Sequence, residues 1–97
     1  MLSYELSEEA DKDLEDIFNY TIEKYGIHQA KIYLNKIDSA LSKLGNNPGI
    51  GRERPEVRHG LRSLLVENYT IFYRVLADRL RIVRVLHSRR DIIKLFE

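Results

Sequence analysis

The chain has 97 residues, a formal net charge of +1, 32% charged residues and no cysteine. This length suits one domain over residues 1–97 and leaves no room for a second core. The absence of cysteine excludes disulfides, thiolate metal sites and cysteine nucleophiles, and it is typical of a cytoplasmic protein.

The first predicted elements are a short strand and a long helix. Residues 2–6 alternate apolar and polar side chains, which indicates a strand. The acidic N-terminal stretch has no long apolar run, so we expect neither a signal peptide nor a membrane anchor. Ser7 is a favourable N-cap, followed by acidic residues where the helix dipole favours them. Apolar residues then recur at helical spacing up to Tyr25, and Gly26 suits the C-terminal end of a helix of roughly 18 residues.

A second helix is predicted directly after this glycine. Apolar side chains keep the helical period from Ala30 to Leu44, and residues 45–48 stop the helix. Because the break between the two helices is so short, they must fold back as an antiparallel pair. Residues 45–59 form a long loop, which is either a crossing connection to the sheet or a functional loop.

Three strands are predicted at residues 61–66, 69–76 and 80–87, joined by tight turns, so they form an antiparallel meander. Ser88 is expected to cap a last helix over residues 89–96, with Asp91 at its third position as in a capping box. The predicted fold class is α+β with the order β-α-α-β-β-β-α. It comprises an antiparallel sheet, a helical hairpin packed on one face, a short C-terminal helix and an uncovered second face.

Few residues suggest enzymatic chemistry. His28, His59 and His87 lack the spacing of a metal site, and the sequence has no glycine-rich phosphate cradle, so we expect neither a metal nor another cofactor. Tyr69 and Tyr73 share one face of a strand and suit either base stacking or packing within the sheet, of which packing is the more common role. The tyrosines of the helix pair are expected in its core or at its rim.

All ten arginines follow position 50. Residues 1–47 carry 5 Lys against 9 acidic residues, a net charge of −4, whereas residues 48–97 carry 10 Arg and 1 Lys against 6 acidic residues, a net charge of +5. Arg62, Arg74 and Arg84 interrupt apolar rows on the predicted strands. On the last strand the side chains expected on one face are Leu80, Ile82, Arg84 and Leu86. A charge in such a row indicates either a paired, partly buried side chain or a face open to a partner.

Motifs spread along nearly the whole chain resemble one known family. They are Tyr4, Leu6-Ser7, Ala10, Asp13-Leu14, Ile17, Tyr25-Gly26, Gln29-Ala30, Pro48, Gly51, Gly60-Leu61-Arg62, Tyr69, Ile71-Phe72-Tyr73-Arg74, Val83, Leu86-His87 and Arg90-Asp91. In this order and spacing they resemble the ParE branch of the RelE/ParE toxin superfamily. The resemblance implies the toxin of a type II toxin–antitoxin pair, with the same element order, that inhibits DNA gyrase without chemistry of its own. It also implies a ParD-like antitoxin partner, through which alone the toxin would contact DNA.

Two other functions stay open at this point. The RelE branch cleaves mRNA on the ribosome, but the positions that match its catalytic side chains hold Thr70, Ile92 and Phe96 here, none of which offers an acid or a base. The catalytic candidates left for a ribonuclease are His87, Arg62 and Arg84. The other alternative is a binder of nucleic acid or of an acidic partner, without toxicity.

Two sets of contact residues follow from the division of the chain. The basic C-terminal half is expected to bind the target. Its predicted contacts are Arg62, Arg74, Arg84, His87, Arg89 and Arg90. The acidic helix pair is expected to bind an antitoxin segment that folds on binding. Its predicted contacts are Leu14, Phe18, Tyr33 and Ile37.

Overall fold

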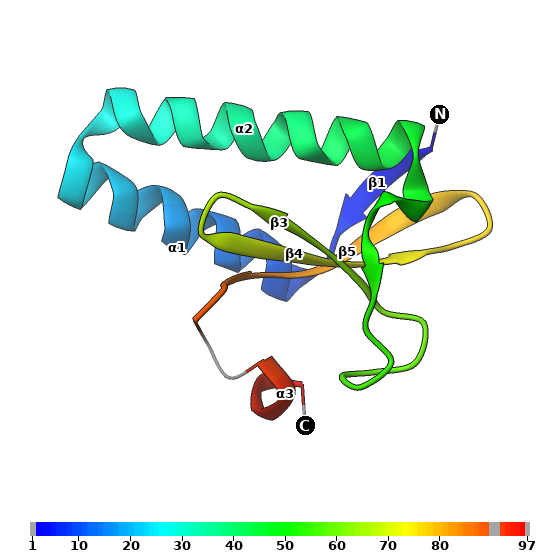
Figure 1. Cartoon of the computed structure of the whole chain (residues 1–97). Helices are drawn as coiled ribbons and strands as arrows, with labels where there is room; N and C mark the ends of the chain where they lie inside the picture. Colours follow the sequence, from blue (N-terminus) through cyan, green and yellow to red (C-terminus); the bar gives the residue numbers. More distant parts are fainter. Residues whose placement is uncertain (1, 90–91, 97) are drawn as a thin grey trace.

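The computed structural model describes residues 2–89 and 92–96. In chain order the elements are β1 (Ser3–Leu6), α1 (Glu8–Tyr25), α2 (Ile27–Asn46), the 3₁₀ turn η1 (Pro48–Ile50), β2 (Arg52–Glu53), β3 (Arg62–Val66), β4 (Tyr69–Val75), β5 (Arg79–His87) and α3 (Ile92–Leu95). The strands form one sheet in the order β1-β5-β4-β3-β2. Helices α1 and α2 lie side by side over one face of the sheet, and α3 lies on the other side (Figure 1). The predicted α+β class with a helical hairpin is confirmed.

Local sequence signals determine the helical hairpin. Ser7 caps α1: its Oγ accepts a hydrogen bond from the Ala10 amide at 2.9 Å and donates one to the Val83 carbonyl at 2.7 Å. Gly26 separates the two helices with a φ of 93°, a conformation that side-chain-bearing residues rarely adopt. A single residue between two long helices forces the chain to reverse, so α2 packs antiparallel on α1. None of the helices in the described part has the length and apolar character needed to cross a membrane.

The sheet is mixed, so the expectation of a purely antiparallel sheet is wrong in one pairing. β1 runs parallel to β5, with partners from Ser3–Arg79 to Leu6–Ile82. The helical hairpin returns the chain to the end where β1 began, so β3 runs in the same direction as β1. Two hairpin reversals later, β5 has that direction again. The meander itself is antiparallel as predicted.

The predicted loop 45–59 contains two short elements. η1 is followed by β2, which pairs with Arg62 and Ser63 of β3. Tyr73 organises this segment, because its hydroxyl donates to the Pro48 carbonyl at 2.8 Å and accepts from the Gly51 amide at 2.9 Å. Tyr73 is fully buried, which agrees with the packing interpretation of this tyrosine.

A β-bulge in β5 changes which side chains reach the main core. The partners on either side of it are Ile82–Tyr73 and Arg84–Phe72. Val83 is therefore an extra residue on β5, and the alternation of faces inverts after it. Leu80 and Ile82 pack under the helices as predicted, but Val85 rather than Arg84 continues that row. The expectation that Leu80, Ile82, Arg84 and Leu86 share one face is wrong for this reason.

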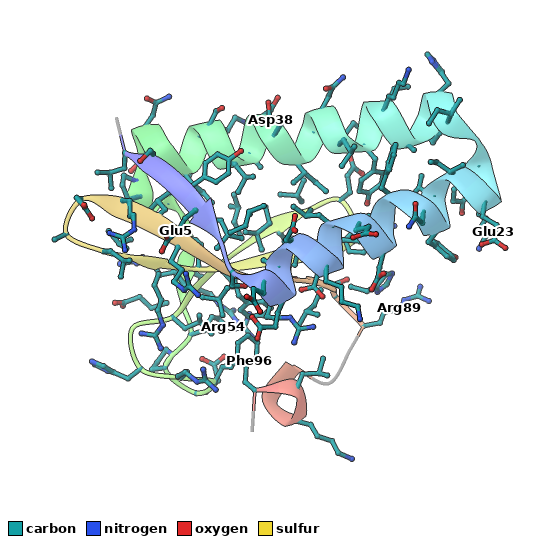
Figure 2. The ribbon with its side chains drawn as sticks, turned by 180° about the vertical axis from the view of Figure 1, so that it is seen from behind. Glu5, Glu23, Asp38, Arg54, Arg89 and Phe96 are labelled. Atoms are coloured by element: carbon teal, nitrogen blue, oxygen red, sulfur yellow. The ribbon has the colours of Figure 1, made fainter. Side chains whose placement is uncertain are left out.

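The second face of the sheet is partly covered, contrary to expectation. Leu61, Phe72 and Leu86 are buried there as a second cluster, apart from the main core beneath α1 and α2. Phe96 packs against it with its ring 5.2 Å from that of Phe72, and Val57 of the loop adds to it. Figure 2 shows Phe96 on the side of the sheet away from α1 and α2. Residues of the loop and of the C-terminal segment thus cover part of the sheet face opposite α1 and α2.

The C-terminal helix is described over Ile92–Leu95 rather than from residue 89. Ser88 and Arg89 lie in a turn, and the Ser88 amide donates to the Asn68 carbonyl at 2.9 Å. Arg90 and Asp91 lie outside the described residues. The predicted capping box of Ser88 and Asp91 therefore stays a prediction.

Candidate functional sites

Arg84 has a structural partner. Its Nε and Nη2 donate to the two carboxylate oxygens of Asp13 on α1 at 2.8 and 3.0 Å, and the Val85 amide donates to the same carboxylate at 3.0 Å. The side chain of Asp13 is 12% exposed and that of Arg84 22%. The Asp13 carboxylate raises the pKa of Arg84. This bidentate pair fastens α1 to β5, so Arg84 has little capacity left for a target.

Arg62 is also engaged within the chain. Its Nη1 donates to the Gly51 carbonyl at 2.7 Å and approaches the Gly49 carbonyl at 3.4 Å. Its Nη2 lies 3.7 Å from a carboxylate oxygen of Glu53. These contacts hold the η1–β2 segment on β3, so the predicted contact role of Arg62 competes with a structural one.

Arg74 lies in a cationic cavity of 340 Å³ beside α3, here called the arginine cavity. Its lining residues are Ser7, Glu9, Arg58, Arg74, Arg81, Val83, Arg84, Leu95 and Phe96. Arg58 donates to the Phe96 carbonyl at 2.7 Å and stacks over its ring at 5.3 Å, and Arg81 pairs with Glu5 at 3.1 Å. Within the described parts of the chain, no hydrogen bond or ion pair engages the guanidinium of Arg74. Of the predicted target contacts that line this cavity, Arg74 is therefore the one whose guanidinium is available to a partner.

Sequence analysis missed Arg58. It lies in the loop before β3, and no periodic pattern marks it there. Only the fold brings this loop against the C-terminal helix, where the cation stacks on Phe96.

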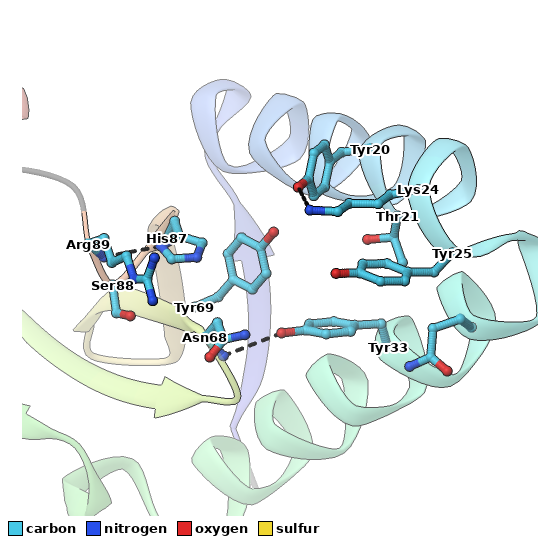
Figure 3. A pocket seen from close by; sticks show the side chains of 11 residues that line it. Tyr20, Thr21, Lys24, Tyr25, Tyr33, Asn68, Tyr69, His87, Ser88 and Arg89 are labelled. Carbon is cyan, nitrogen blue, oxygen red and sulfur yellow. Dashed lines mark hydrogen bonds between the residues drawn. The ribbon is translucent and has the colours of Figure 1, made fainter.

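His87 and Arg89 open onto a different and larger space, a cavity of 830 Å³ called the tyrosine cavity (Figure 3). It is lined by Tyr20, Thr21, Lys24, Tyr25, Gln29, Tyr33, Asn68, Tyr69, His87, Ser88 and Arg89. The ring of Tyr69 meets Tyr33 edge to face at 5.5 Å and His87 at 5.4 Å. The Arg89 amide donates to His87 Nδ1 at 3.1 Å. The cavity thus lies between the two helices, the start of β4 and the end of β5.

The tyrosines of this cavity fall into two pairs. Tyr33 and Tyr69 are half-buried, and burial raises the pKa of both phenols. Tyr20 and Tyr25 are 51% and 61% exposed. Lys24 donates to the Tyr20 hydroxyl at 3.1 Å and lies 5.5 and 5.6 Å from the ring centres of Tyr20 and Tyr25. Sequence analysis placed the helix tyrosines in the core or at the rim and missed the cavity that they share with β4 and β5.

The structure does not bring the three ribonuclease candidates together. Arg62 pairs with Tyr73 on β4, whereas His87 pairs with Tyr69, four residues away along the same strand. At the rise of a β-strand this separation is about 13 Å. Arg84 is nearer to His87, but its guanidinium is held by α1. Among residues 2–89 and 92–96, no three His, Cys, Asp or Glu side chains are placed to hold a metal ion.

The predicted antitoxin contacts differ in exposure. Leu14, Phe18 and Tyr33 are partly exposed, but Ile37 is 2% exposed and packs in the main core. A partner therefore has no access to Ile37 unless the core opens.

A groove between α2 and β3 offers apolar surface that sequence analysis missed. Its volume is 570 Å³, and its lining residues are Ile32, Asn35, Lys36, Ser39, Ala40, Lys43, Ile50, Leu64, Leu65, Val66 and Glu67. Leu65 is 63% exposed. β2 covers only the first two residues of β3, so within the described chain no strand pairs with the outer edge of β3 at positions 64–66.

Comparisons with known proteins agree with this fold. Residues 4–92 match the family model described as the ParE toxin of the type II toxin–antitoxin system parDE. Toxin ParE1 of Mycobacterium tuberculosis is 40% identical over 90 residues, 92% of each chain, and Toxin ParE1 of Caulobacter vibrioides is 34% identical over 88 residues, 91% of each chain. The chromosomal ParDE system from P. aeruginosa contains a chain that superposes with a TM-score of 0.77 at 24% identity, covering 90% of this chain and 96% of that one. The E. coli DinJ–YafQ toxin–antitoxin complex gives a TM-score of 0.57 at 20% identity, covering 90% and 92%.

Proposed function

Because this chain belongs to the ParE toxin family of type II toxin–antitoxin systems, we propose that it inhibits DNA gyrase and that a ParD-like antitoxin neutralises it. The family membership over residues 4–92 carries this proposal. Both partners would meet the toxin in the cytoplasm, and its contact with DNA would come only through the antitoxin.

The arginine cavity supports binding rather than chemistry as the mode of action. Among the described residues none pairs with the guanidinium of Arg74 there, and Arg58 adds a second positive charge whose hydrogen bond goes to a neutral carbonyl. Guanidinium groups suit carboxylates on an acidic protein surface. From the predicted set we propose first Arg74 in this cavity and Arg89, which lines the tyrosine cavity, as target contacts, whereas Arg84 and Arg62 act through the fold.

A gyrase supercoiling assay with the purified chain tests the proposal. We expect the wild-type chain to block supercoiling and Arg74→Ala to weaken inhibition roughly 10- to 150-fold, since a charge-assisted hydrogen bond contributes about 1.5–3 kcal/mol. Arg52→Ala is the matched control, because Arg52 is an exposed arginine outside the arginine cavity. A chain that leaves supercoiling intact and cleaves mRNA on ribosomes would refute the proposal in favour of the ribonuclease.

For the antitoxin we propose the groove between α2 and β3 as the principal docking site. An extended segment of the antitoxin would add a strand at the open edge of β3 and place apolar side chains against Leu65 and Ile32. Lys43 at the same groove favours an acidic segment. The helix pair, with Leu14, Phe18 and Tyr33, would continue the contact.

Hydrogen exchange on the toxin, free and in complex, tests this docking mode. We expect amides of residues 64–66 to gain protection in the complex, while those of residues 77–78, in the turn between β4 and β5, stay unchanged. Leu65→Asp should weaken the complex without affecting the fold, because this side chain is mostly exposed. Unchanged exchange at the edge of β3 in a complex that forms would exclude strand addition there.

A further inference from the structure

The charged side chains described at the tyrosine cavity are all basic. Lys24, His87 and Arg89 line it, and none of its described lining residues is acidic, although α1 is an acidic helix. Asp13 and Asp16 open instead onto a separate cavity of 190 Å³ that shares Tyr69 and His87. No described residue makes a hydrogen bond or ion pair with the Arg89 guanidinium. An anion would therefore meet positive charge here from Lys24 on α1 and from Arg89 just after β5.

Two of the four tyrosines are largely exposed, and the ammonium of Lys24 lies over the rings of both. Tyr33 and Tyr69 have a structural role, since they pack edge to face and the Tyr33 hydroxyl accepts from the Asn68 amide at 3.3 Å. Tyr20 and Tyr25 leave half or more of their surface in water, with Lys24 close to both rings. Figure 3 shows the hydroxyl of Tyr25 directed toward Tyr69 across the cavity. Exposed aromatic faces beside a cation are the elements with which proteins stack a base and hold its phosphate.

The size and shape of the cavity favour a compact ligand over a peptide strand. Its 830 Å³ lies in the range of about 300–1,000 Å³ typical of small-molecule sites. Tyr69 pairs on both sides, with Val66 and with His87, so β4 offers no free strand edge at this place. Asn68 and Gln29 add amide side chains that suit the polar edge of a base.

We propose that the tyrosine cavity binds a nucleobase together with its phosphate, with the base stacked on Tyr25 or Tyr20 and the phosphate held by Lys24 and Arg89. This chemistry is common to a free nucleotide and to the end of a single-stranded nucleic acid. The site is separate from the arginine cavity and from the groove at β3, but it shares Arg89 with the proposed gyrase contacts and Tyr33 with the proposed antitoxin contacts. Direct titration with a ligand tests it without gyrase or the antitoxin.

Calorimetric titration of the purified chain with adenosine, AMP and a 5′-phosphorylated single-stranded oligonucleotide tests the proposal. We expect AMP to bind more tightly than adenosine. Tyr25→Leu should weaken AMP binding roughly 5- to 150-fold, the range for loss of one base–aromatic stack. Tyr4→Leu is the matched control, since Tyr4 is 40% exposed and lies outside the cavity.

The Lys24→Gln variant measures the contribution of the phosphate to binding separately from that of the base. It should lower the affinity for AMP and leave that for adenosine within about 2-fold, with an unchanged circular dichroism spectrum. Binding of AMP identifies a free nucleotide as sufficient, whereas binding of the oligonucleotide alone identifies a strand end, and both support the site. Equal effects of Tyr25→Leu and Tyr4→Leu would overturn the proposal. The proposal would also be overturned if neither AMP nor the oligonucleotide bound at millimolar concentration. The same holds if an acidic peptide bound more tightly and neither of them displaced it.

Discussion

The pair of Asp13 and Arg84 allows a structural role to be separated from target binding. Asp13 accepts three hydrogen bonds, two of them from Arg84 and one from the Val85 amide, and both side chains are mostly buried. Asp13→Ala leaves a guanidinium and an amide without an acceptor. A fully buried broken pair costs about 3–5 kcal/mol, and the remaining exposure here reduces that to about 2–4 kcal/mol. For a domain of this size the melting temperature should fall by at least about 8 °C.

Urea denaturation of the single and double variants measures the coupling between the two side chains. Arg84→Met keeps the length of the side chain, and Asp13→Asn keeps one oxygen for the Val85 amide, so each should cost less than Asp13→Ala. The double-variant cycle should give a coupling of at least about 1 kcal/mol. Gyrase inhibition should decrease only in step with unfolding. If Arg84→Met kept full stability and lost inhibition, Arg84 would be a target contact after all, and the structural assignment would be refuted.

Three further predictions concern the fold that supports these sites. Gly51→Ala should lower the free energy of unfolding by about 2–4 kcal/mol, because the new Cβ would overlap the Tyr73 hydroxyl. The control is Gly49→Ala, whose Cβ meets no atom within 4 Å and should change stability by under about 0.5 kcal/mol. Thermal melts of the two variants measure the difference. Burial raises the pKa of Tyr73 above 10.0, so its contribution to stability is complete below about pH 10 and is lost as pH rises through the raised pKa. Tyr73→Phe should flatten that decline in denaturation measured from pH 8 to 11. Ser7→Ala should cost about 1–2 kcal/mol, measured by urea denaturation, because it removes the N-cap acceptor of the Ala10 amide.

The elements set by neighbouring residues could be predicted from the sequence. Ser7 and Gly26 lie at the two ends of α1, and both cap the helix through backbone groups within four positions of them. The three strands of the meander also follow from local alternation and tight turns, within one or two residues of their observed ends.

The face of Arg84 could not be predicted, because distant residues decide it. β1 leaves the sheet at Leu6, and Ser7 then takes the carbonyls of Ile82 and Val83 as hydrogen-bond acceptors, at the point where β5 bulges. The partner of Arg84 comes from α1, 71 residues earlier in the chain. No period within β5 encodes either contact. The tyrosine cavity is similar, since its lining comes from α1, α2 and the ends of β4 and β5.

Some of the opposite charges of the two halves of the chain pair with each other within the fold. Glu5 of β1 accepts a hydrogen bond from Arg81 and forms an ion pair with Arg79, and both lower the pKa of its carboxyl. Asp13 of α1 binds Arg84. Part of the acidic N-terminal half therefore neutralises part of the basic C-terminal half inside the molecule. The positive surface that a partner meets is smaller than the +5 of residues 48–97 indicates.

This internal pairing has a consequence for salt dependence. The pair at Asp13 is partly buried, so ions screen it weakly, whereas the guanidinium of Arg74, which no residue in the described part of the chain pairs with, is open to screening by solvent ions. Added salt should thus weaken association with an acidic target well before it loosens the contact between α1 and β5. The two classes of arginine differ in their partners rather than in their position along the sequence, and this difference determines which of them is available for binding.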